Sequence, residues 1–111
     1  MTVNPRAKGA RAEREIASIL RDKYGFADCR RGQQFSGLYG DADVVGIPGL
    51  HLEIKNVQRL NVRNAMAQSE RDAKDGEIPV VMHKMDRKPW LVTLNLDDFM
   101  TLYMAWKGGD D

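Results

Sequence analysis

The feature that constrains the fold most is a pair of β-rich segments separated by a Pro-Gly turn signal. These segments cover residues 42–47 and 51–57. Because alternate side chains of a strand share one face of a sheet, the second segment places Glu53 and Lys55 on one face and leaves the other face apolar. The sequence therefore predicts that an acid and a base are held side by side on rigid backbone.

Asp43 lies on an otherwise apolar face of the first of these segments. A carboxylate there is costly unless it is paired or bound to a cation. In a strict two-residue hairpin, Asp43 would lie opposite Ile54 and point away from Glu53. We therefore predict an odd loop length or a β-bulge that brings Asp43 beside Glu53 or Lys55.

The remaining pattern predicts one mixed α/β sheet flanked by helices, in the order α-β-β-β-α-β-β-α. Helices are expected at residues 9–23, 62–75 and 96–106, and strands at 26–30, 42–47, 51–57, 79–84 and 90–94. Gly25 and Gly76 are expected to end the first two helices, and Asn95 or Asp97 to cap the third.

Length and composition exclude several classes of protein. The 111 residues fit a single domain, and we expect residues 1–7 and 108–111 to be flexible. No apolar run is long enough to span a membrane and the N-terminus has no signal-peptide core, so we expect a cytoplasmic protein, in a host cell if it is phage-encoded. The single cysteine, Cys29, excludes an intramolecular disulfide and a cysteine-based zinc cluster.

The first helix supplies another carboxylate. Its apolar face centres near Ile16 and Leu20, and Glu13 lies within about 60° of that centre on a helical wheel. Glu15 lies roughly 100° away on the other side. Glu13 is therefore the acid that we expect to point toward the sheet.

Together these residues suit a hard divalent cation, because Mg²⁺ prefers oxygen ligands from carboxylates and carbonyls. Each residue also has an ordinary explanation. Glu53 and Lys55 are compatible with an exposed ion pair, Asp43 with a turn, and Glu13 with an arginine partner. The combination of all four favours a metal-dependent site.

Two stretches of the sequence resemble a known superfamily of nucleases. Asp43, followed by Glu53-Ile54-Lys55 on the next strand, resembles the PD-(D/E)xK signature, with Ala42 in place of its proline. The stretch from Lys8 to Ile16, then Arg30-Arg31 and a Gly/Ser loop, resembles the opening of archaeal-type Holliday junction resolvases and related phage nucleases. The likeness covers residues 8–58 well, whereas the short hairpin and the C-terminal helix depart from it.

This resemblance implies a restriction-endonuclease-like fold and a Mg²⁺-dependent DNA endonuclease, in which Mn²⁺ would substitute. The implied metal ligands are Asp43, Glu53, the Ile54 backbone carbonyl and Glu13, the last directly or through water. Lys55 would orient the attacking water or stabilise the phosphate, and Gln58 would be a further polar residue of the site. The expected DNA contacts are Arg14, Arg30, Arg31, Ser36 and Lys84. Because Arg30 and Arg31 are successive residues at a strand, at most one is expected to face the active site.

The implied substrate is branched DNA such as a four-way junction, cut by a homodimer, since symmetric cutting needs two active sites. Part of the apolar surface of the last helix is expected to pack on the sheet, and the excess either forms a dimer interface or serves the core alone. That surface comprises Phe99, Met100, Leu102, Tyr103, Met104 and Trp106. His51 and His83 lack metal-pair spacing and are interpreted as structural or surface residues. Two alternatives stay open, a general duplex or nicking nuclease and a non-catalytic DNA-binding protein.

Overall fold

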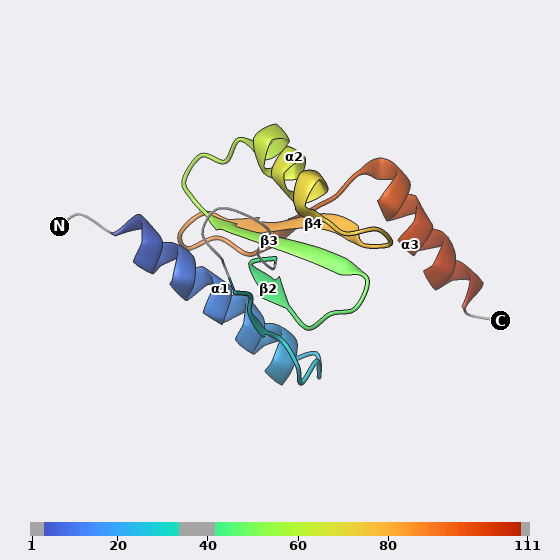
Figure 1. Cartoon of the computed structure of the whole chain (residues 1–111), viewed down its shortest axis with the longest axis horizontal. Coiled ribbons are helices and arrows are strands. Elements are labelled where there is room, and N and C mark those ends of the chain that lie inside the picture. Colours follow the sequence, from blue (N-terminus) through green and yellow to red (C-terminus); the bar gives the residue numbers. More distant parts are fainter. Residues whose placement is uncertain (1–3, 34–41, 110–111) are drawn as a thin grey trace.

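A computed structural model describes residues 4–33 and 42–109 of the chain. Its elements are α1 (Pro5–Asp22), β1 (Arg30–Arg31), β2 (Val44–Val45), β3 (Leu50–Asn56), α2 (Val62–Asp72), β4 (Ile78–Lys84), β5 (Leu91–Thr93) and α3 (Leu96–Gly108). They form a five-stranded sheet in the order β1-β2-β3-β4-β5, with α1 and α2 on opposite faces (Figure 1). Among the described strands, only β3 and β4 pair in parallel. The predicted α/β class and order of elements are confirmed.

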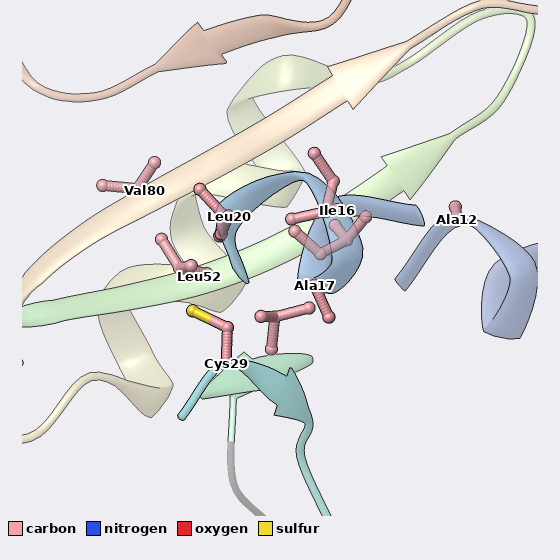
Figure 2. Packing of buried hydrophobic residues seen from close by; sticks show 9 residues of the cluster. Ala12, Ile16, Ala17, Leu20, Cys29, Leu52 and Val80 are labelled. Carbon is pink, nitrogen blue, oxygen red and sulfur yellow. The ribbon is translucent and has the colours of Figure 1, made fainter. Parts of the chain in front are cut away.

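The side chains of β3 alternate between two cores. One core lies between the sheet and α1 (Figure 2) and contains Ala12, Ile16, Ala17, Leu20, Cys29, Val44, Leu52, Ile54 and Val80. The other lies between the sheet and α2 and contains Ala65, Met66 and Val81. Because Glu53 pairs with Val81 in the register of β3 and β4, Glu53 lies on the α2 face.

Helix α1 begins at Pro5, four residues before the predicted start at Gly9. The Asn4 side chain accepts hydrogen bonds from the N–H groups of Arg6 (2.9 Å) and Ala7 (3.4 Å), and proline suits the first helical turn. Residues 5–7, which were expected to belong to a loose arm, thus form the first turn of α1. At the other end Gly25 adopts a φ of 81°, as its predicted role in ending the helix requires.

Strands β1 and β2 are shorter than predicted. Residues 26–29 do not extend into a strand, because the N–H of Phe26 donates to Leu20 and the N–H of Cys29 donates to Phe26, which bends the chain. β2 ends before Gly46, whose φ is 112° and whose added Cβ would lie 2.5 Å from the Asp28 carbonyl oxygen. Close backbone packing therefore limits both strands.

The two later helices also differ from the predictions. α2 ends at Asp72 because Ala73 is extended, so Gly76 does not close it. α3 continues to Gly108, and Asn95 at its N-cap position makes no side-chain cap hydrogen bond. None of the residues of α3 is buried, so the prediction that part of its apolar surface packs on the sheet is wrong. No helix within residues 4–33 and 42–109 is long and apolar enough to cross a membrane.

Candidate active site

The register of the β2–β3 hairpin fixes the position of Asp43. Val44 pairs with Leu52, which leaves an odd number of residues between paired positions. The next position along places Asp43 opposite Glu53, and directly opposed residues of an antiparallel pair share a face. The predicted odd loop is confirmed, and it brings the two carboxylates together.

The Asp43 carboxylate also replaces part of the ladder between the strands. Its Oδ2 accepts a hydrogen bond from the N–H of Ile54 at 2.9 Å. In a regular continuation of the hairpin this N–H would reach the carbonyl of Ala42. Because the N–H and C=O of one strand residue point to the same edge, the Ile54 carbonyl also faces Asp43.

The two carboxyl groups share one proton. Burial, followed by the negative charge of Glu53, raises the pKa of Asp43 from 3.8 to about 7, against the opposing hydrogen bond from Ile54. Burial also disfavours ionisation of Glu53, but hydrogen bonds from His51 and Asp43 and the charge of Lys55 outweigh it and lower the pKa of Glu53. Below about pH 7, Asp43 therefore holds the proton and Glu53 the negative charge.

His51 is a contact of this pair that the sequence analysis missed. Its side chain is buried, with Nε2 2.8 Å from Oε1 of Glu53 and Nδ1 3.8 Å from Oε1 of Glu77. Burial lowers the pKa of His51, but the hydrogen bond and charge of Glu53 and the charge of Glu77 outweigh it, so the pKa is raised. His51 is structural, as one interpretation had it, and specifically it holds Glu53. The signal was its position two residues before Glu53 on one strand face.

A cavity of about 500 Å³ opens beside Asp43. Its lining residues are Pro5, Lys8, Gly9, Glu13, Asp43, Ile54, Lys55, Asn56, Val57 and Gln58. The structure thus brings together five of the predicted site residues, Glu13, Asp43, Ile54, Lys55 and Gln58. Glu53 is 3% exposed and does not itself line the cavity. The Nζ atom of Lys55 donates to Oε1 of Gln68 on α2 at 3.3 Å.

Asn56 is the second residue that the sequence analysis missed. Its Oδ1 atom is buried and has no hydrogen-bond partner among the described residues. Strand alternation places Asn56 on the opposite face from Lys55, so the sequence pattern did not indicate that it belongs to the site. The structure shows that Asn56 lines the cavity at the end of β3. It offers an unused oxygen acceptor in the same cavity.

The arginines lie on the β1 side of the site. Arg31 donates from Nε to Oε1 of Glu13 at 2.9 Å, and the Glu13 side chain is 17% exposed. Arg30 instead donates to the carbonyl of Asp28 at 3.0 Å, so only one of the two arginines faces a candidate site residue, as predicted. Arg31 and Arg30 also line a depression of about 260 Å³ with Arg14, Ala17, Ser18 and Arg21.

Lys84, a predicted DNA contact, is not brought to the cavity. Lys84 lies with Nζ 3.7 Å from Oε1 of Glu15 and 5.6 Å from the centre of the Trp90 ring. Ser36 lies outside the described residues. His83 is half-buried with Nε2 2.8 Å from Oγ1 of Thr93, which is a structural role.

The donor set fits a hard divalent cation. In residues 4–33 and 42–109 no three His, Cys, Asp or Glu side chains converge as a preformed metal cluster. Mg²⁺ needs no such cluster, because it is commonly bound through one or two carboxylates and retains several waters. The carboxylates of Asp43 and Glu53, the Ile54 carbonyl and the unpartnered Oδ1 of Asn56 offer oxygen ligands only.

The chain has a mixed sheet between helices, with Asp43 directly before one strand and with Glu53 and Lys55 on the next strand. This arrangement is that of the restriction-endonuclease-like class of nuclease domains. The family model described as "Phage putative PDDEXK endonuclease" matches residues 4–108, and the chain therefore belongs to this family. It is thus a member of the PD-(D/E)xK nucleases, which usually depend on a divalent metal. No curated protein matches the chain significantly.

Proposed function

We propose that the chain is a Mg²⁺-dependent, structure-selective DNA endonuclease that hydrolyses phosphodiester bonds at Holliday junctions. One observation carries the proposal: half-buried Asp43, which shares a hydrogen bond with the buried Glu53, borders a cavity that Lys55 also lines. Two neighbouring carboxylates that are largely shielded from water repel each other when both ionise, and a divalent cation relieves this repulsion. Mn²⁺ is expected to substitute for Mg²⁺.

Each residue has a distinct role in this proposal. Asp43, Glu53 and the Ile54 carbonyl would hold the ion, with Glu13 reaching it directly or through water. The ion, when bound, lowers the pKa of a water and neutralises charge on the phosphate. Lys55 would orient the attacking water and stabilise the negative charge of the pentavalent phosphate. Gln58 would hydrogen-bond to water or phosphate at the cavity, and cleavage would leave a 5′-phosphate and a 3′-hydroxyl.

The arginine depression beside the cavity suits the DNA backbone, because guanidinium groups bind phosphate oxygens in a planar fork. Arg14, Arg30 and Arg31 would contact phosphates on either side of the cut. Arg31 would exchange Glu13 for a phosphate, which frees the Glu13 carboxylate to turn toward the ion. Ser36 and Lys84 stay candidate contacts with more distant parts of the DNA.

The DNA structure that is cut separates the alternatives. Symmetric incision of a four-way junction would use a homodimer, with one active site on each of two strands. A general nuclease with the same residues would cut or nick ordinary duplex, and a non-catalytic relative would bind DNA without cutting it. In each case the DNA lies in the cytoplasm of a bacterial host, where we expect the protein to act.

The experiment compares a labelled four-way junction with a linear duplex of the same sequence, in the presence of Mg²⁺. Paired, symmetric nicks on the junction alone are expected. Equal cutting of both substrates would instead indicate a general nuclease. The absence of cutting with either Mg²⁺ or Mn²⁺, or unchanged cutting by Asp43→Asn, would refute the catalytic proposal.

A pair of lysine variants tests the role of Lys55. Lys55→Ala should lower the cleavage rate by roughly 100-fold or more while DNA binding persists, because it removes a charge that acts mainly on the transition state. Lys88→Ala is the matched control, because Lys88 is exposed and does not line the cavity. Equal rates for the two variants would remove Lys55 from the mechanism.

A further inference from the structure

Helix α3 presents an apolar surface that the described part of the chain leaves uncovered. Its exposed members are Leu96, Phe99, Met100, Leu102, Tyr103, Met104 and Trp106, and their exposed fractions run from 40% to 71%. Figure 1 shows α3 leading away from the sheet to the C-terminus, and none of its residues is buried. A 13-residue helix with no buried residue is marginal in water, so α3 needs a covering surface.

The shape of this surface suits helix pairing. On a helical wheel the seven side chains span an arc of roughly 200°, about twice the width that packing on a single sheet requires. Within the arc, a seam with alternating spacings of three and four residues runs the length of the helix. Its members are Leu96, Phe99, Tyr103 and Trp106. This is the spacing of a two-helix interface, and the Tyr103 and Trp106 rings already pack edge to face at 5.7 Å.

The charges on α3 favour a second copy of the same helix. Asp97 and Asp98 lie in its first turn and Lys107 in its last turn. An antiparallel pair of two copies places the first turn of each beside the last turn of the other, so opposite charges meet at both ends. The polar arc carries Asp97, Asp98 and Thr101 and no basic residue, which disfavours DNA or an anionic membrane as the occupant.

We propose that α3 is a self-association surface through which two copies of the chain pair in antiparallel orientation. Leu96 of one copy would face Trp106 of the second copy, and Phe99 would face Tyr103. Pairing along the seam would remove from water the exposed side chains of Leu96, Phe99, Tyr103 and Trp106, which are 40% to 71% exposed in the single chain. The pairing uses no residue of the cavity, so it stands or falls independently of the proposed nuclease activity, and it joins two cavities in one particle.

The test measures the molar mass of the full chain by light scattering after size exclusion, over a range of concentrations. We expect a dimer for the wild type and for Thr101→Glu, which places the same new charge on the polar arc of the same helix. Tyr103→Glu should weaken dimerisation by at least about tenfold, because it puts a charge in the centre of the seam. Both positions are exposed, so neither change removes a contact from the two cores.

Two results would overturn this proposal. A wild type that stays monomeric would mean that another partner covers α3. A Tyr103→Glu variant that dimerises as well as Thr101→Glu would place the interface elsewhere. The antiparallel orientation is tested by Lys107→Glu, which should weaken the dimer a few-fold, and by adding Asp97→Lys and Asp98→Lys, which should restore it. A dimer that does not respond to these charge reversals would overturn the orientation.

Discussion

The Asp43→Asn variant should be more stable than the wild type at alkaline pH, although the proposed mechanism predicts that it does not cleave DNA. An asparagine keeps an acceptor for the N–H of Ile54 and gives Glu53 an amide donor, as the protonated aspartic acid does. The substitution therefore preserves both hydrogen bonds and removes only the charge that Asp43 acquires when it ionises. Its effect on the free energy of unfolding isolates the cost of that charge.

The size of the effect follows from the pKa of Asp43, which burial and Glu53 raise from 3.8 to about 7. The folded state thus binds this proton more tightly than the unfolded chain. The stability that this group contributes is complete below pH 3.8, falls as the pH rises through about 7, and stays low above it. A shift of this size is worth at most ~4 kcal/mol, and solvent screening and the coupled Glu53 reduce it to about 2 kcal/mol.

Urea unfolding of both proteins in a chelating buffer, at about pH 5 and about pH 8, measures this cost. The advantage of Asp43→Asn should be about 2 kcal/mol at the higher pH and roughly a third of that at the lower pH, where Asp43 is already ionised in the unfolded chain but not in the folded one. Adding Mg²⁺ at the higher pH should stabilise the wild type and leave the variant unchanged, because binding to the folded state alone stabilises it. An asparagine variant that is less stable than the wild type at about pH 8, or a difference that does not vary with pH, would refute the reasoning.

Three further substitutions test individual contacts. His51→Ala should lower the free energy of unfolding by about 2 kcal/mol because it leaves the buried Glu53 short of a donor, whereas His51→Gln keeps a donor and should lower it less. Calorimetric titration should show that His51→Gln binds Mg²⁺ more tightly than His51→Ala does. Equal affinities would contradict the role of His51 in holding Glu53. Gly46→Ala should lower stability by about 2 kcal/mol or more in thermal unfolding, since its Cβ would lie 2.5 Å from the Asp28 carbonyl oxygen; an unchanged melting temperature would contradict this. Asn4→Ala should cost about 1 kcal/mol through loss of the cap, while Asn4→Asp should be nearly neutral, and equal losses would argue against capping.

The elements of the fold were predictable where periodicity is strong. The alternation around Glu53 and the helical spacing of Ile16 and Leu20 identify β3 and α1 and the faces they bury. The limits of β1 and β2 were not predictable, because they depend on the close approach of Gly46 to the backbone of Asp28. That contact joins segments far apart in the sequence.

The candidate site divides in the same way. Strand alternation predicted that Glu53 and Lys55 share a face, and helical periodicity predicted that Glu13 points toward the sheet. Both predictions were possible because each depends on the residues of a single strand or helix. His51 was missed as a contact of the site because its burial beside Glu53 depends on how closely α2 packs on β3, which the sequence of β3 alone does not indicate. For α3, periodicity gave the width of the apolar arc but not the surface that covers it, so the expected packing on the sheet was wrong.

The odd register of the β2–β3 hairpin also limits how this family of sequences can change length. Surface connections usually tolerate insertions and deletions freely. Here, losing one residue between Gly46 and Gly49 would favour the register in which Asp43 lies opposite Ile54, and the carboxylate would turn to the α1 side of the sheet. We therefore expect active relatives to differ in the length of this connection by two residues, or by one residue only where a bulge compensates. Among aligned relatives, connections with an odd number of residues should therefore outnumber those with an even number.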